Sequence, residues 1–241
     1  MRATRIGLLA AAALAAAAPG WGQSPDLALR LERRAAAGNA EARYHLGMLY
    51  NNGIGVPRDP RRAFAFFRAA AEAGDPLGAY KLGCYYAGQF GGEAVAPDEG
   101  EALRWKLVAA RAGYSLAQND VAVHYLRREQ WAEARPWLEA AGRQGEAQAL
   151  YNLSMLHHDG LGGAPSRPHA WAYFRLSQLA GRGEITENAE RPLAEMWAPM
   201  SEAERAEATR LAATFVTGQT PLTRRAMEGV ERAERVASGA G

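Results

Sequence analysis

The sequence predicts an all-α protein built as a solenoid of stacked helical hairpins. A phrase that begins at Ala42 and reads Ala-Arg-Tyr-His-Leu-Gly-Met-Leu-Tyr returns 36 residues later, at Gly78, as Gly-Ala-Tyr-Lys-Leu-Gly-Cys-Tyr-Tyr. Each copy is followed by a loop and then by an apolar segment that closes at a glycine, Gly74 or Gly113. Hydrophobic residues make up 48% of the chain, which suits close-packed helices. A hairpin of this length cannot bury its apolar face alone, so successive copies must stack.

The first helix of each unit is defined by apolar spacing. Ala42, Leu46 and Leu49 fall at i, i+4 and i+7, which is one face of a helix. Gly47 and Gly83 lie inside these helices, where a glycine costs about 1 kcal/mol relative to alanine. We therefore expect a neighbouring helix to approach closely at both glycines.

The second helix is bounded by turn and capping residues. Gly53, Gly55 and Pro57 break the chain, Asp59 is placed to cap the next helix, and Pro60 suits its first position. The expected apolar face of this helix consists of Ala63, Phe66, Ala69 and Ala70. The glycines expected to cap the ends of the four units are Gly74, Gly113, Gly145 and Gly181.

This spacing divides the chain into consecutive segments. A leading segment or helix at 23–36 precedes four units at 37–72, 73–111, 112–143 and 144–181. Residues 182–217 are expected to form capping helices, the first from Ile185 to Trp197 and the second opened by the capping signature Ser201-x-x-Glu204. Leu211, Phe215 and Val216 are expected to give the second capping helix its apolar side. Residues 218–241 are weakly apolar and charged and predict a flexible tail.

The units resemble the Sel1-like repeat, a relative of the tetratricopeptide repeat. The matching features are Ala-x-Tyr-x-Leu-Gly-x-x-Tyr, a Gly-x-Gly-Val loop at residues 53–56, an Asp, Ala-x-x-aromatic, and a closing Ala-Ala-x-x-Gly. Unit three departs most, because its loop is reduced to residues 127–130, and unit four carries Ser154 in place of Gly47. The resemblance covers residues 37–181 and implies a right-handed α-solenoid with an adaptor or regulatory role.

The first 22 residues read as an export signal. Arg2 and Arg5 precede an apolar run from Ile6 to Ala18, which is too short to span a bilayer, and small residues at Gly20 and Gly22 suit cleavage before Gln23. The alternatives are an uncleaved membrane anchor and a merely Ala-rich start. Removal of the signal changes the formal charge from +2 to 0, because two arginines and no acids are lost. We expect a periplasmic or secreted protein without stable membrane insertion, and no basic stripe suggests nucleic acid as a partner.

The expected partner-binding surface follows the exposed positions of the first helices. These positions recur at i, i+4, i+7 and i+11 and mix Met, amide, charged and aliphatic side chains, which suits an extended peptide or a partner helix. An ordinary solvated helix face is the alternative. The predicted partner-binding residues are Glu41, His45, Met48, Asn52, Lys81, Asp120, Arg127, Gln148, Asn152, Met155 and Asp159, interspersed with Leu77, Cys84, Gly88, Leu116 and Val123.

No residue pattern predicts catalysis, a cofactor or a metal. The run His157-His158-Asp159 points its side chains in different directions, and His157 replaces the Tyr of other units, which predicts packing. Cys84 is a lone thiol, which excludes an internal disulfide, and His45 is the one neighbouring base that the repeat suggests. The chain lacks a Gly-x-Ser-x-Gly elbow and a Walker lysine.

These observations favour an exported scaffold, without catalysis of its own, that binds a protein or peptide in the cell envelope. One alternative is an envelope enzyme or ligand binder acting on peptidoglycan or β-lactams, as implied by cysteine-rich Sel1-like proteins. Those proteins carry a cysteine pair in each repeat, whereas this chain has only Cys84. Another alternative is a self-associating structural protein.

Overall fold

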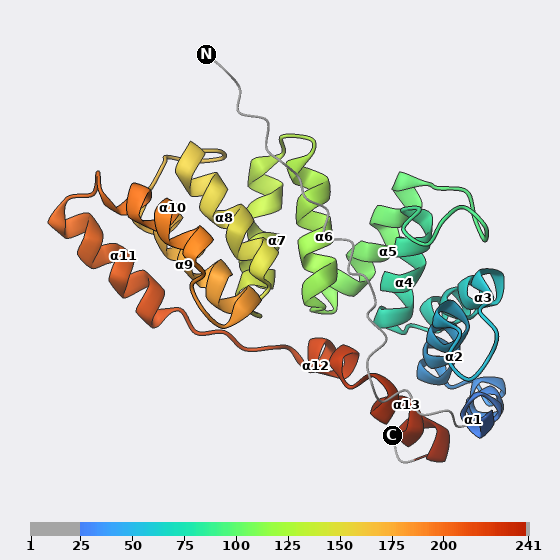
Figure 1. Cartoon of the computed structure of the whole chain (residues 1–241). Coiled ribbons are helices and arrows are strands. Elements are labelled where there is room, and N and C mark those ends of the chain that lie inside the picture. Colours follow the sequence, from blue (N-terminus) through green and yellow to red (C-terminus); the bar gives the residue numbers. More distant parts are fainter. Residues whose placement is uncertain (1–24, 240–241) are drawn as a thin grey trace.

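The computed structural model describes residues 25–239, and this part of the chain contains thirteen helices and no strand. The signal peptide predicted at residues 1–22 lies outside the described residues. Four helix pairs follow the leading helix α1 (Pro25–Ala36) and stack in chain order into an arc (Figure 1). The pairs are α2 (Ala40–Asn52) with α3 (Pro60–Glu72), α4 (Pro76–Tyr86) with α5 (Glu99–Arg111), α6 (Ser115–Leu126) with α7 (Trp131–Gly142), and α8 (Ala147–Asp159) with α9 (Arg167–Arg182). The protein is an α-solenoid, as predicted.

The helix boundaries follow local capping chemistry. The Asp59 side chain accepts a hydrogen bond from the Arg62 amide at the start of α3, and Asp75 and Asp98 do the same for α4 and α5. Gly74, Gly113 and Gly145 adopt positive φ angles of 87°, 93° and 84° and turn the chain between units. The expectation for Gly181 was wrong, because α9 continues to Arg182 and the left-handed cap is Gly183.

The glycines inside the first helices mark close helix contacts, as predicted. A Cβ atom on Gly47 would lie 2.6 Å from the Phe67 ring of α3. A Cβ atom on Gly83 would lie 2.8 Å from the stem of Lys106 on α5. In unit four Ser154 takes this place, and its hydroxyl donates to the Ala170 carbonyl at 2.7 Å. The fourth unit therefore replaces a steric fit by a buried hydrogen bond.

Two helices, α10 (Glu187–Trp197) and α11 (Glu202–Thr214), pack against α9 and follow the last pair. Ser201 and Glu204 form the expected capping box at the start of α11. The predicted apolar side of α11 was partly wrong. Phe215 and Val216 lie beyond its end, and Val216 is 83% exposed, because the chain leaves the helix in an extended conformation after Thr214.

The last segment is ordered as helices, in contrast to the predicted flexible tail at 218–241. Residues 215–239, here called the strap, contain an extended connection followed by α12 (Pro221–Met227) and α13 (Gly229–Ser238). The strap returns from α11 to α1, so that the last described helix packs against the first two (Figure 1). Ala233, Val236 and Ala237 are buried there, which explains why a weakly apolar segment is folded.

Candidate functional site

The strap follows the edge of the solenoid where one unit turns into the next. Its amide at Gly218 donates to the Arg143 carbonyl at 2.8 Å, and the Thr220 hydroxyl donates to the Gly113 carbonyl at 2.9 Å. Further along, Arg225 reaches Asp75 and Arg232 reaches Glu41. The strap thus contacts the turns in the reverse of their chain order and ties the last units to the first.

A buried polar network fixes the middle of the strap. Gln144, only 8% exposed, donates to the Gly113 carbonyl at 2.9 Å and to Gln118 at 2.8 Å. Its side-chain oxygen accepts from the Thr220 amide at 3.1 Å and the Thr223 hydroxyl at 2.6 Å. Thr223 in turn accepts from the Ser115 amide at 3.1 Å. Helix α6 has no side-chain cap from its own N-cap residue, so the strap supplies this cap from a distant part of the chain.

Two carboxylates bind the far end of the strap. Asp75 uses Oδ1 to cap α4 through the Gly78 amide at 2.7 Å and Oδ2 to bind the Arg225 guanidinium at 2.6 Å. Glu41 accepts two hydrogen bonds from Arg232, at 2.8 and 3.1 Å. Burial would raise the pKa of Glu41, but the nearby His45, Arg232 and Arg225 lower it to about 2. We call the surface formed by Glu41, Asp75, Gly113 and Gln144 the rim.

The rim changes the interpretation of the predicted binding residues in unit one. Glu41 is occupied by the strap's arginines, and His45 is 4% exposed with its Nε2 atom 3.7 Å from Glu41. The expectation that both are open to a partner was therefore wrong. Met48 remains half-buried on α2, and Asn52 is exposed at the end of that helix.

In the other units the predicted residues divide by depth. Three of them, Leu77, Cys84 and Asn152, are buried and cannot contact a partner. Lys81, Asp120, Gln148 and Met155 are half-buried, and Arg127 and Asp159 are exposed at the ends of α6 and α8. The remaining positions include Leu116, which is 39% exposed on α6, and the sequence reasoning missed Tyr151, which is 36% exposed on α8. We define the first-helix face as Met48, Lys81, Leu116, Asp120, Gln148, Tyr151 and Met155.

Charged groups on the first-helix face are held in place by the second helices. Lys106 on α5 is 9% exposed and its Nζ atom lies 2.6 Å from the Asp120 carboxylate on α6. The lysine stem passes beside Gly83, where no side chain fits. Glu146, at the start of α8, has a raised pKa because it is partly buried and faces the charge of Asp120. Sequence reasoning missed Lys106, because an isolated lysine on a second helix carries no periodic signal.

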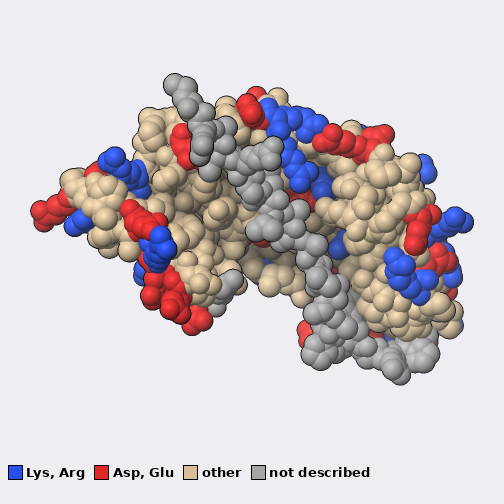
Figure 2. Space-filling model, turned by 45° about the horizontal axis from the view of Figure 1, so that its top comes forward, with Lys and Arg blue, Asp and Glu red and all other residues tan. Residues whose placement is uncertain are grey.

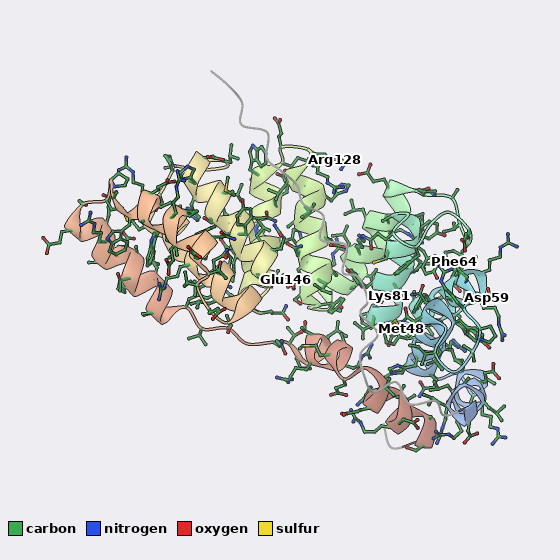
Figure 3. All side chains as sticks on the ribbon, in the orientation of Figure 1. Met48, Asp59, Phe64, Lys81, Arg128 and Glu146 are labelled. Atoms are coloured by element: carbon green, nitrogen blue, oxygen red, sulfur yellow. The ribbon has the colours of Figure 1, made fainter. Side chains whose placement is uncertain are left out.

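Figure 3 shows how these residues are distributed. Met48 and Lys81 lie on the neighbouring helices α2 and α4, and Glu146 lies at the turn before α8. Arg128 lies at the opposite edge from α12 and α13, where it pairs with Glu99 at 2.8 Å. Figure 2 shows acidic and basic side chains interspersed across the visible face. The charged side chains in this view do not form one extended patch of a single sign.

The lone thiol is enclosed. Cys84 is 2% exposed, and burial raises its pKa, an effect only partly opposed by Lys106 and Lys81. Tyr80 and Asp120 are the other groups acting on this thiol, and His45, the base that the sequence suggested, is not among them. A buried thiol with a raised pKa is not activated as a nucleophile.

His157 packs in an aromatic cluster, as predicted. Its ring stacks on His169 at 4.7 Å and on Tyr173 at 5.6 Å, and its Nε2 atom accepts from Arg135 at 3.1 Å. Burial, then His169 and Arg135, lower its pKa to about 4. Within residues 25–239 no group of three or more His, Cys, Asp or Glu side chains could hold a metal ion, and no helix is long and apolar enough to cross a membrane.

Comparison with known proteins identifies the family. The Sel1 repeat model matches residues 40–75, 76–114 and 147–191, and the unmatched stretch between them is the divergent third unit. The chain belongs to the Sel1 repeat family, whose members typically serve as protein–protein interaction scaffolds.

Several solved structures are similar to this chain, and one of them supports the fold. A Sel1 repeat protein from Oxalobacter formigenes shares 24% identity over 87% of this chain and 80% of that protein, with a TM-score of 0.59. A protective antigen of uropathogenic Escherichia coli with an SLR fold shares 19% identity over 88% of this chain, with a TM-score of 0.49, and this chain spans 50% of its length. An immunity protein from Pseudomonas aeruginosa shares 20% identity over 81% of this chain and 74% of that protein, with a TM-score of 0.48.

Proposed function

We propose that this protein is an exported scaffold that binds a protein or peptide partner in the cell envelope, with an adaptor or regulatory role and no catalysis of its own. The observation that carries the proposal is the first-helix face. Leu116 and Tyr151 expose apolar surface on the successive first helices α6 and α8, and Lys81, the Lys106–Asp120 pair and Glu146 add charged groups along the same stack. Exposed apolar anchors beside fixed charges are what a partner side chain or helix requires.

The rigidity of the stack supports the same proposal. Each first helix is fixed against its second helix by contacts such as that of Gly47 with Phe67. The strap further joins the two ends of the stack. A pre-formed surface loses little conformational freedom when a partner binds, so modest contacts can give useful affinity.

The test is site-specific photo-crosslinking in the native cell. A photoreactive residue is placed at Leu116 or Tyr151, and a matched probe is placed at Ala65, an exposed position on the second helix α3. We expect one dominant crosslinked envelope protein from the first two positions and none from Ala65. Equal labelling from all three positions, or no adduct from a correctly exported protein, would refute the scaffold function.

Export is tested in the same preparation. We expect the purified protein to begin at Gln23, as shown by intact mass, and to be released with the periplasmic or secreted fraction. A protein that retains residues 1–22 and stays with the membrane would contradict the cleavage prediction.

A further inference from the structure

The strap shows that the rim accepts one particular kind of segment. Its helical part begins with the capping pair Thr220-Pro221, continues with arginines that meet carboxylates, and buries the small residues Ala233 and Ala237. The strap is therefore an arginine-bearing segment of two short helices bound beside two carboxylates.

The carboxylates of the rim are placed to bind arginine side chains. The side chain of Asp75 is 3% exposed and that of Glu41 is 16% exposed. Both are fixed: Asp75 because it caps α4, and Glu41 because it lies in the first turn of α2. If the strap left, two partly desolvated carboxylates would face solvent at the positive ends of these helices. A cationic side chain from another segment could then take the place of Arg225 or Arg232.

The strap is attached by polar contacts more than by a large apolar face. Its helices bury chiefly alanines, together with Val236 and Thr223, while Met227 is 69% exposed. The pair between Arg30 and Glu234 is partly open to solvent, at 30% and 38% side-chain exposure, so water competes with this contact. The connection at 215–220 is extended, so the strap can detach without unfolding α11.

We propose that the rim is a binding site for an arginine-bearing amphipathic helical segment, filled in the resting protein by the strap, and that the partner inserts a segment of the same kind in its place. This inference rests on the proposed function, because it specifies the chemistry of the partner. It also explains why Glu41, a predicted binding residue of unit one, is occupied in this structure.

The test uses the full chain and a labelled synthetic peptide of residues 218–239. In the variant Arg225→Glu/Arg232→Glu the strap is repelled by the rim, and hydrogen exchange should show increased exchange over 221–238 while the circular dichroism of the repeats is retained. The peptide should bind this variant at least tenfold more tightly than the wild type, whose rim is occupied. Adding Glu41→Gln to the variant should abolish most of that binding, and a control peptide with both arginines replaced by Glu should not bind.

Several outcomes would overturn the proposal. One is a loosened strap without peptide binding, and another is unchanged hydrogen exchange, which would mean that the ion pairs do not hold the strap. If the double variant does not fold, Arg232→Ala is used instead. This variant frees Glu41 from Arg232 while Arg225 still pairs with Asp75, and the peptide should again bind it more tightly than it binds the wild type. A wild-type dimer by light scattering would assign the rim to a second copy of the chain instead. Crosslinks at Leu116 and Tyr151 without peptide binding would refute this inference alone, whereas peptide binding without cellular crosslinks would refute the scaffold function alone.

Discussion

At the scale of the residue, the glycines of the first helices set how closely the helices pack. The ring of Phe67 is fully buried and occupies the space where a side chain on Gly47 would lie. A Cβ atom added to Gly47 would be only 2.6 Å from this ring. The helix-forming cost of glycine is about 1 kcal/mol, so the fit must be worth more than this for the glycine to be useful.

We predict that Gly47→Ala destabilises the protein by about 1–3 kcal/mol, because overpacking outweighs the better helix propensity. The matched control is Gly181→Ala, also within a helix, where a Cβ atom would lie 3.4 Å from Ala147 in ordinary contact. The control should be neutral or stabilising by up to about 1 kcal/mol. Urea unfolding of both variants measures the difference, and a destabilisation of equal size in both would contradict the steric argument.

At the scale of the element, the strap caps helix α6, whose own N-cap residue makes no side-chain hydrogen bond. Thr223 is 5% exposed. Its hydroxyl accepts a hydrogen bond from the Ser115 amide and donates one to the Gln144 side-chain oxygen. We predict that Thr223→Val, which keeps the shape but removes the hydroxyl, lowers the free energy of unfolding by about 1–3 kcal/mol. Thr217→Val, at an exposed position of the same segment, should have almost no effect. Thermal unfolding checks both, and hydrogen exchange should localise the loss to α12 and the start of α6.

How much of the fold could be predicted depends on the range of the contacts. The repeat units were readable because Leu46, Gly47 and the closing glycines report contacts between neighbours in sequence. Thr220-Pro221 and the spacing of Leu222, Ala226, Ala233 and Val236 carried the same helix signals as Asp59-Pro60, so α12 and α13 could have been recognised as helices. Their docking position could not, because Arg232 and Glu41 are 191 residues apart and no periodicity links them.

The candidate site was predicted only in part for a similar reason. Helical spacing identified Lys81, Asp120, Gln148 and Met155 as side chains of the first helices, and all four are accessible to some degree. It could not distinguish them from His45 and Asn152, which are buried, because helical spacing does not report which of the exposed-face positions a neighbouring element covers. Tyr151 was missed because its equivalents, Tyr44 and Tyr80, belong to the family pattern and read as core.

At the scale of the whole molecule, the strap makes the solenoid a closed unit whose stability depends on charge. Glu41 joins α2 to α12 and α13, and its pKa is about 2 in the folded protein instead of 4.5. A carboxylate whose pKa is lowered by folding stabilises the protein above its unfolded pKa, and this contribution is lost as pH falls toward the folded value. The relevant window is therefore pH 4.5 to about 2.

We predict that the wild type loses stability of the order of 3 kcal/mol across this window through Glu41 alone, since each pKa unit corresponds to about 1.4 kcal/mol. Glu41→Gln should be less stable than the wild type at pH 7, because Arg232 loses its carboxylate, and the two proteins should converge in stability near pH 2. Glu133→Gln, which alters an exposed carboxylate on α7, should parallel the wild type throughout. Melting temperatures recorded from pH 7 to pH 2 check all three proteins. A constant difference between Glu41→Gln and wild type down to pH 2 would show that the strap is held by something other than this ionised carboxylate.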